Sequence, residues 1–123
     1  MKRDALQGGP VIVRGDGTAL RSYLHPADLA VWLLRILLRG RSGRAYNVGS
    51  DEAVTTAQLA RLIADAVDPA MAVTVQALQP SGPQNVYLPD IRRARAELGL
   101  DVWLPLREAI ARTVAFHRDL TDD

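Results

Sequence analysis

Length, composition and charge place this chain among ordinary single-domain proteins and exclude several classes of site. Its 123 residues are 48% hydrophobic and 24% charged with a formal net charge of +1, so the balance indicates neither a nucleic acid nor an anionic membrane as partner. The sequence has no cysteine, which excludes disulfides, thiolate zinc sites and cysteine nucleophiles, and its only lysine is Lys2.

The first predicted elements are short. Residues 2–7 are compatible with the last turns of a helix, which the Gly-Gly-Pro sequence at 8–10 would end. The β-branched run 11–13 predicts a strand, and residues 20–24 predict a second one. Between them, Gly-Asp-Gly at 15–17 favours a tight turn, because both glycines tolerate a positive φ. The two strands are therefore expected to form a hairpin.

The next predicted element is a helix from Pro26 to about Arg39, followed by Gly40. Proline suits the first helical position, and a carboxylate at Asp28 suits the first turn. Apolar residues surround this helix almost completely: Ala30, Val31, Trp32, Leu33, Leu34, Ile36, Leu37 and Leu38. A helix that is apolar all round must be enclosed on most sides. We therefore expect part of its surface to face another domain or subunit.

Two further elements follow. Residues 45–48 predict a strand that ends at Gly49. Thr55 and Gln58 form a capping box for an amphipathic helix, which Asp68-Pro69 would end. The apolar face of this helix recurs with helical spacing at Leu59, Leu62, Ile63, Ala66 and Val67.

The remaining elements complete an α+β fold. Residues 72–77 predict a weak strand, and Asp90 to Gly99 a short helix capped at both ends. Pro105 precedes a final amphipathic helix. We expect one domain over residues 1–123, with a small sheet of short strands, four or five helices, and a loose tail from about residue 119. The strands are too few and too short for a full doubly wound sheet.

Four segments carry a resemblance that covers nearly the whole chain. They are residues 15–30 (GDGTALRSYLHPADLA), residues 43–49 (GRAYNVG), residues 87–100 (YLPDIRRARAELGL) and the final helix, 106–116. In order and spacing they resemble signature stretches of the NAD-dependent epimerase/dehydratase family of extended short-chain dehydrogenases. The resemblance favours the branch of nucleotide-sugar 4,6-dehydratases and 4-epimerases. It implies the C-terminal lobe of such an enzyme without its Rossmann half.

The parts that this family uses for chemistry are missing from the sequence. Its cofactor fingerprint is G-x-x-G-x-x-G, but here Gly40 and Gly43 are followed by Tyr46. Its catalytic pair is Tyr-x-x-x-Lys, and with Lys2 as the only lysine no tyrosine can have this partner. We therefore expect neither a catalytic residue nor a cofactor site in this chain, with NAD implied only for a full-length parent.

Two residues are candidate substrate contacts. The resemblance implies that Arg21 contacts the substrate diphosphate, and a guanidinium is well suited to paired charge-assisted bonds with phosphate. The alternative is a surface arginine. The resemblance also implies that Asn47 lies near the nucleotide, in a strand where asparagine is disfavoured. The alternative for Asn47, equally weighted, is a side chain that caps a neighbouring turn.

The sequence departs from the family in one loop. Many relatives carry R-x-G-D there, whose arginine and acid clamp the diphosphate and the ribose. In the loop 79–85 of this chain, Gly82 is retained but Pro80 and Pro83 occupy the positions of the arginine and the acid. This loss removes one charge-assisted clamp. Either the ligand is not the usual nucleotide diphosphate, or more of its binding falls on Arg21.

Other polar residues are interpreted as structural. Asp28 belongs to the first turn of a buried helix, and His25 is expected to pack or to cap that helix. The cluster Arg92, Arg93 and Arg95 is expected to be a solvated face. The two histidines are far apart in sequence and indicate no metal site.

Two functions are consistent with these observations. The first is the substrate-binding portion of an NAD-dependent nucleotide-sugar epimerase/dehydratase, similar to dTDP-glucose 4,6-dehydratases. It would be inactive alone, with a nucleotide-diphosphate sugar and the missing Rossmann domain as partners. The alternative is a free-standing binding or assembly module that self-associates through its apolar surface as a homo-oligomer. The start lacks the pattern of a signal peptide, and the longest apolar run, 29–38, is about half a membrane span. A cytoplasmic location is therefore expected.

Overall fold

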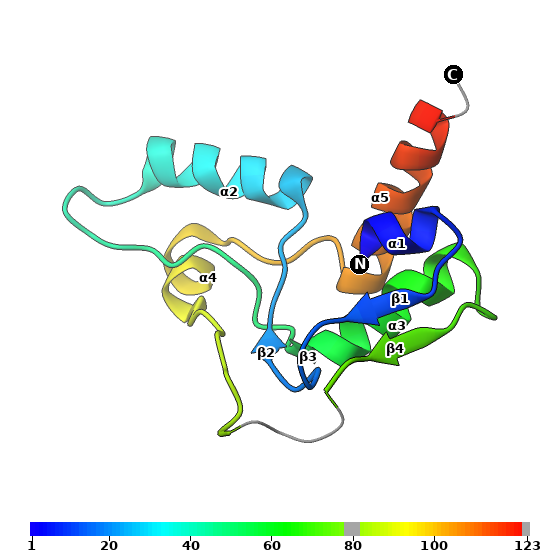
Figure 1. The fold of residues 1–123 in the computed structure, drawn as a ribbon. Helices are drawn as coiled ribbons and strands as arrows, with labels where there is room; N and C mark the ends of the chain where they lie inside the picture. Colours follow the sequence, from blue (N-terminus) through cyan, green and yellow to red (C-terminus); the bar gives the residue numbers. More distant parts are fainter. Residues whose placement is uncertain (78–81, 122–123) are drawn as a thin grey trace.

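The helices and strands gather into two groups that are joined by a short antiparallel pair of strands (Figure 1). The computed structural model describes residues 1–77 and 82–121. The first group contains α1 (Lys2–Leu6), β1 (Val11–Val13), α3 (Thr56–Val67), β4 (Val73–Val75) and α5 (Leu106–Thr121). The second contains α2 (Pro26–Arg39) and α4 (Arg92–Leu98), and the joining pair is β2 (Leu20–Arg21) with β3 (Val54–Thr55).

The predicted hairpin is wrong. β1 pairs in parallel with β4, and β2 pairs antiparallel with β3, so the described residues contain two two-stranded sheets instead of one. The turn at 15–17 is present, with Asp16 Oδ1 accepting hydrogen bonds from the backbone N–H and the hydroxyl of Thr18. The chain then turns toward α3, because the Gly17 and Ala19 carbonyls accept from the amides of Ala57 and Thr56.

The first group surrounds the larger core. α3 and α5 are amphipathic as predicted, and the capping box of Thr55 and Gln58 is formed in both directions. The buried residues of this core are Ala5, Val11, Val13, Leu59, Ala60, Ile63, Ala64, Met71, Leu106, Ile110 and Val114. The tail predicted to be loose from about residue 119 is instead helical as far as Thr121, as a continuation of α5.

The second core is smaller and holds α2 to α4. It consists of Trp32, Ile91, Ala94 and Leu100. The Trp32 Nε1–H donates to the carbonyl of Asp101 at 2.8 Å, and the backbone N–H of Leu104 donates to the buried Asp28 carboxylate at 2.9 Å. Asp28 is thus a structural residue, as predicted, and it fixes the segment before α5 against α2.

The short helix α4 begins slightly later than predicted. Its N-cap position is Ile91, yet Asp90 still accepts a hydrogen bond from the backbone N–H of Arg92 at 3.1 Å. Gly99 ends the helix, as predicted, and it takes the left-handed conformation with φ of 62°.

The outer face of α2 is not covered by the described residues. Only Asp28 and Trp32 of this helix are buried. Its exposed apolar residues are Leu29, Val31, Leu33, Leu34, Leu37 and Leu38, and the last two are 79% and 78% exposed. Residues 1–77 and 82–121 therefore do not enclose the most hydrophobic helix.

The strand predicted at 45–48 is not formed, because no strand lies beside it in the described parts of the chain. Residues 45–48 make no backbone–backbone hydrogen bond with any described residue. Their side chains still alternate: Tyr46 and Val48 pack against the second core, whereas Ala45 and Asn47 are exposed.

Candidate functional site

Arg21 lies in β2, opposite Val54 of β3, and is half-buried. Its Nη1 donates to the carbonyl of Leu20 at 2.9 Å and to the carbonyl of Asn85 at 3.2 Å. Among the described residues, no carboxylate forms an ion pair with Arg21. The guanidinium is therefore oriented by neutral groups and retains its capacity to bind an anion.

The described end of the 79–85 loop is held beside Arg21. The Leu20 N–H donates to the carbonyl of Asn85 at 2.8 Å, and the Tyr87 N–H donates to the carbonyl of Leu20 at 2.9 Å. The Gln84 amide donates to the carbonyl of Thr18 at 2.8 Å. The neutral part of this loop thus lies against β2, while Pro80 falls outside the described residues.

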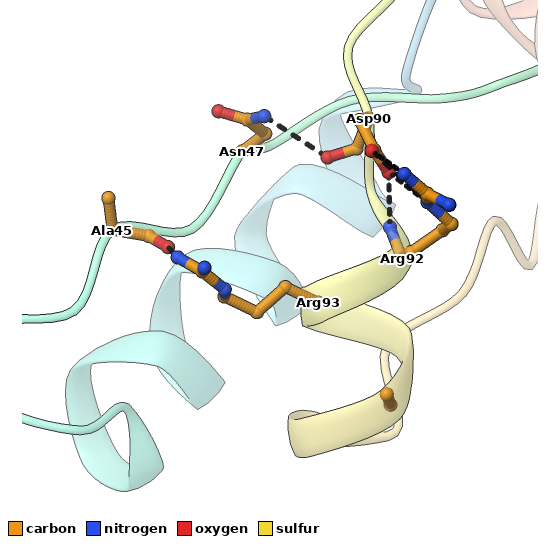
Figure 2. Close-up of a pocket in the computed structure, with 6 residues that line it drawn as sticks. Ala45, Asn47, Asp90, Arg92 and Arg93 are labelled. Carbon is orange, nitrogen blue, oxygen red and sulfur yellow. Dashed lines mark hydrogen bonds and ion pairs between the residues drawn. The ribbon is translucent and has the colours of Figure 1, made fainter.

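Asn47 lines a hollow of about 550 Å³ between the 45–48 segment and α4. The hollow is bounded by Ala45, Asn47, Asp90, Arg92, Arg93 and Ala96. Figure 2 shows the Asn47 amide pointing to the backbone carbonyl of Asp90, to which its Nδ2 donates at 3.1 Å. This bond agrees with the structural interpretation of Asn47. It leaves the amide oxygen without a hydrogen-bond partner among the described residues.

The charges around this hollow are only partly balanced. Arg92 and Asp90 form an ion pair of 2.6 Å, which together with a backbone N–H lowers the pKa of the Asp90 carboxyl to about 2. Arg93 donates to the carbonyl of Ala45 at 2.9 Å and has no ion-paired carboxylate in the described chain (Figure 2). The hollow therefore presents one neutralised pair and one available cation beside Asn47.

The third arginine of the cluster departs from the predicted solvated face. Arg92 and Arg93 are exposed, as expected. Arg95 instead pairs with Asp51 and with Asp101. Its guanidinium lowers the pKa of the Asp51 carboxyl. The pKa of the Asp101 carboxyl is lowered first by the backbone N–H of Val102 and then by Arg95. Arg95 thus ties α4 to two segments of the chain.

The structure does not bring the two predicted site residues into one pocket. Arg21 is absent from the lining of the hollow that contains Asn47. The residues that do lie beside Asn47, namely Asp90 and Arg93, were assigned only structural roles from the sequence. The Tyr-x-x-Asp motif at 87–90 was the signal that could have drawn attention to Asp90.

The histidines have local roles. His25 Nδ1 accepts a hydrogen bond from the backbone N–H of Ala27 at 3.0 Å and caps α2, as predicted. The ring Nε2 of His117 lies 2.8 Å from Lys2 Nζ. In residues 1–77 and 82–121, no group of three histidines or carboxylates is placed to hold a metal ion. None of the helices described is long and apolar enough to cross a membrane.

The glycine turn at 15–17 does not have the form of a dinucleotide-binding turn. A dinucleotide needs a glycine-rich turn that leads from a strand into a helix N-terminus. The turn at 15–17 leads instead from β1 to β2, and a Cβ at Gly17 would lie 2.9 Å from the Cβ of Ala57. This turn is filled by α3 and offers no cradle for a diphosphate.

Comparison with known proteins identifies similar enzymes that act on nucleotide sugars. Residues 1–49 match the model of the NAD dependent epimerase/dehydratase family. The chain is 31% identical to the dTDP-glucose 4,6-dehydratase of Streptomyces antibioticus over 114 residues, which are 93% of this chain and 34% of that protein. It is 27% identical to UDP-glucuronic acid decarboxylase 1 of Arabidopsis thaliana over 110 residues, 89% of this chain and 25% of that protein.

A solved structure shares the fold. The UDP-glucose 4-epimerase of Thermotoga maritima, determined with UDP-glucose, superposes with a TM-score of 0.82 at 22% identity. The superposition covers 98% of this chain and 38% of the epimerase. The chain spans only about a quarter to a third of the length of the relatives that it matches in sequence.

Proposed function

Because this chain belongs to the NAD-dependent epimerase/dehydratase family, we propose that it is the substrate-binding portion of a nucleotide-sugar dehydratase or epimerase, similar to dTDP-glucose 4,6-dehydratase. It corresponds to the C-terminal lobe, and the dinucleotide-binding half lies outside the chain. NAD and the oxidation of the sugar belong to that other half. The working location is cytoplasmic.

Arg21 is the observation that carries this proposal. Its guanidinium is half-buried, held in β2, and paired only with backbone carbonyls among the described residues. Bonds between an arginine and a phosphate are charge-assisted, and each contributes about 1.5–3 kcal/mol. With Pro83 where relatives carry an acid, the neighbouring loop adds no charge of its own in its described part. Arg21 is thus the main contact for the diphosphate.

Asn47 has a supporting role. Asn47 and Arg93 both line the hollow, and an asparagine oxygen can accept a hydrogen bond from a sugar or ribose hydroxyl. Because Arg21 does not line this hollow, we place Asn47 at the edge of the substrate site.

Titration with nucleoside diphosphates tests the role of Arg21. Binding of uridine, thymidine and cytidine diphosphate is measured by calorimetry for the unchanged chain, for Arg21→Ala and for Arg14→Ala. Loss of one charge-assisted bond should weaken binding by roughly ten- to a hundredfold in Arg21→Ala. Arg14, an exposed arginine in the loop before β2, is the matched control and should have little effect. Equal affinities for Arg21→Ala and the unchanged chain would contradict the assignment.

A turnover assay tests whether this chain binds substrate without performing the reaction. The purified 123-residue chain, with NAD and a nucleotide sugar, should produce no NAD-dependent product, since it lacks the Tyr-x-x-x-Lys pair. Detectable turnover would refute the proposed role as a partial enzyme.

A second candidate is a free-standing module that self-associates as a homodimer. The exposed leucines of α2 favour it, because apolar patches of this kind mark interaction surfaces. Sedimentation equilibrium over a range of concentrations decides the point. A monomer at high concentration contradicts this candidate and leaves the first in place.

A further inference from the structure

We propose that a hollow in the first group of elements binds a small apolar molecule that carries one carboxylate. The hollow is lined by residues of α3 and α5, by residues 23–26 and by Lys2 of α1. The apolar part of the ligand lies against the two helices, and its carboxylate pairs with the ammonium of Lys2. This inference goes beyond the proposed function, because neither Arg21 nor Asn47 lines the hollow.

The first core is open at this hollow. Four of the residues that line it are almost buried but remain 8–9% exposed, namely Leu59 and Ile63 of α3 and Ala109 and Ile110 of α5. Ala60, which is also in α3 but does not line the hollow, is 0% exposed. An apolar ligand would remove this remaining surface of the core from water, which is favourable in proportion to the area covered.

The size of the hollow favours a small molecule. Its volume is about 270 Å³. An apolar cavity of roughly 150 Å³ can hold benzene, so this hollow has room for one aromatic ring and a short alkyl chain. Sites for larger ligands usually begin at roughly 300 Å³. A nucleotide sugar is therefore too large and too polar for it.

The polar groups of the lining are divided between engaged and exposed ones. The Thr113 hydroxyl donates to the carbonyl of Ala109 at 2.8 Å, and His25 Nδ1 accepts from the N–H of Ala27 at 3.0 Å. The other two polar residues of the lining, Lys2 and Tyr23, are both exposed and therefore lie at its mouth. A ligand with an apolar body and one polar end matches this division.

The charge at the mouth favours an anion. Among the described residues, no carboxylate forms an ion pair with Lys2, and none of those lining the hollow is acidic. The Lys2 Nζ lies 2.8 Å from His117 Nε2, and an ammonium has three donors, so this bond leaves capacity for a ligand. The nearest acid along α1, Asp4, instead accepts from the backbone N–H of Ile12 at 3.3 Å.

A carboxylate fits this mouth better than a phosphate. Lys2 supplies a single positive charge at one point, which matches a monoanion, whereas phosphate is bound most effectively by the paired donors of arginine. The Tyr23 hydroxyl can donate a second hydrogen bond to a carboxylate oxygen. Lysine at the mouth and apolar side chains behind it thus define the class of ligand.

Three ligands with one carbon skeleton test the proposal. The chain is titrated with 3-phenylpropionate, 3-phenylpropanol and 3-phenylpropylamine, and binding is followed by nuclear magnetic resonance. The acid should bind with a Kd of roughly 0.1–1 mM, the alcohol about three- to tenfold more weakly, and the amine more weakly still. Equal affinities for the three ligands, or no saturation by the acid below about 10 mM, would overturn the proposal.

Two exposed cations of α1 give matched charge variants. Lys2→Met removes the ammonium but keeps an apolar side chain, and Arg3→Met makes the same change of net charge at a residue that does not line the hollow. Lys2→Met should weaken binding of the acid about three- to tenfold and leave that of the alcohol unchanged, and Arg3→Met should change neither. An equal loss in both variants would contradict a specific contact with Lys2.

Two alanines of α5 locate the apolar part of the site. Ala109 lines the hollow, whereas Ala111 is exposed outside it. Ala109→Leu should fill the hollow and weaken the acid and the alcohol alike by about tenfold or more, and Ala111→Leu should leave both. An Ala109→Leu variant that binds like the unchanged chain would refute this location.

Methyl resonances give the same answer without a substitution, should Ala109→Leu fail to fold. In the unchanged chain, 3-phenylpropionate should shift the methyl signals of Ile63 and Ile110, which line the hollow, and leave those of Ile12, an exposed residue of β1 outside it. Shifts confined to Ile12, or equal shifts of all three, would contradict the site.

A second copy of this chain is the rival occupant of the hollow. The titration is therefore repeated at a low and at a high protein concentration, with the oligomeric state measured by sedimentation. A Kd for the acid that does not depend on protein concentration supports the proposal. Binding that weakens as a dimer forms would assign the hollow to the second copy and refute the proposal.

Discussion

At the scale of single residues, the arginines of this chain differ in what neutralises them. Arg95 lies between Asp51 and Asp101, and both carboxylates pair with its guanidinium. In the part of the chain that the structure describes, the Arg21 guanidinium donates only to the carbonyls of Leu20 and Asn85. A guanidinium whose charge is already matched acts as a cross-link, whereas one held by neutral groups can bind an anion at little reorganisation cost. The same side chain is thus structural in α4 and available for binding in β2.

The Arg95 cross-link gives a pH prediction. The pKa values of Asp51 and Asp101 lie below their ordinary value of 3.8. Their stabilisation is therefore present above about pH 4 and is lost as the pH falls through the lower folded-state pKa values. Arg95→Ala should lower the free energy of unfolding by roughly 1 kcal/mol at pH 7, since the pairs are partly exposed. Below the folded-state pKa values of both carboxyls, the deficit should shrink.

Urea unfolding at a series of pH values from 7 downward measures this effect. Arg112→Ala is the control, because Arg112 also pairs with a carboxylate, Glu108, but within one turn of α5. It should cost a few tenths of a kcal/mol at pH 7. A deficit for Arg95→Ala that stays constant down to low pH would show that Arg95 acts by packing instead of by charge.

The sequence predicted the role of Arg21 but not that of Arg95. The family motif drew attention to Arg21, but nothing local distinguished Arg95 from Arg92 and Arg93. Its partner Asp51 lies 44 residues away in sequence. An ion pair between distant segments depends on how the chain folds, so it cannot be predicted from spacing along one helix.

At the scale of elements, features within one turn of helix were predicted and pairings between segments were not. The capping box at Thr55 and the left-handed end of α4 at Gly99 depend on a few adjacent residues, and both are present. The predicted hairpin required β1 to pair with β2. Instead β1 pairs with β4, and β2 pairs with β3. The turn residues at 15–17 determine a local change of direction of the chain. The pairing of the strands depends also on α3, to which the carbonyls of Gly17 and Ala19 are hydrogen-bonded.

The turn at 15–17 provides a matched pair of substitutions. Gly15 and Gly17 both have a positive φ, of 85° and 75°, but a Cβ at Gly15 would meet open space. Gly15→Ala should therefore cost about 1–2 kcal/mol from its backbone conformation alone. Gly17→Ala should cost about 1–3 kcal/mol more, because its new methyl group would meet the Cβ of Ala57 at 2.9 Å.

Chemical denaturation of the two alanine variants separates these contributions. The difference between them reports how closely the turn is pressed against α3, independent of the shared backbone cost. If the two variants unfold with the same free energy, the contact between Gly17 and α3 does not constrain the path from β1 to β2.

At the scale of the whole molecule, the two cores are unequal. Of the residues that the structure describes, eleven are buried in the first core and four in the second. The helix over the second core, α2, has an apolar face that none of the described residues covers. The segment before α5 connects the two groups, through Trp32 with Asp101, Asp28 with Leu104, and a bond from the Leu106 N–H to Glu52 at 3.1 Å. Three connections of this kind hold the groups in place, but they bury little apolar surface. Each group therefore depends mainly on its own core.

This inequality predicts that the second group unfolds first. Both tryptophans, Trp32 and Trp103, belong to it, since Trp32 is fully buried in its core and Arg35 of α2 lies over the Trp103 ring at 5.9 Å. In urea, tryptophan fluorescence should therefore change at a lower concentration than the last part of the helical circular dichroism signal, to which α3 and α5 contribute.

Ile91→Ala should shift the first transition and Ile63→Ala the second, because these residues lie in different cores. Coincident transitions in all three proteins would mean that the Asp28, Trp32 and Glu52 connections couple the groups into one cooperative unit.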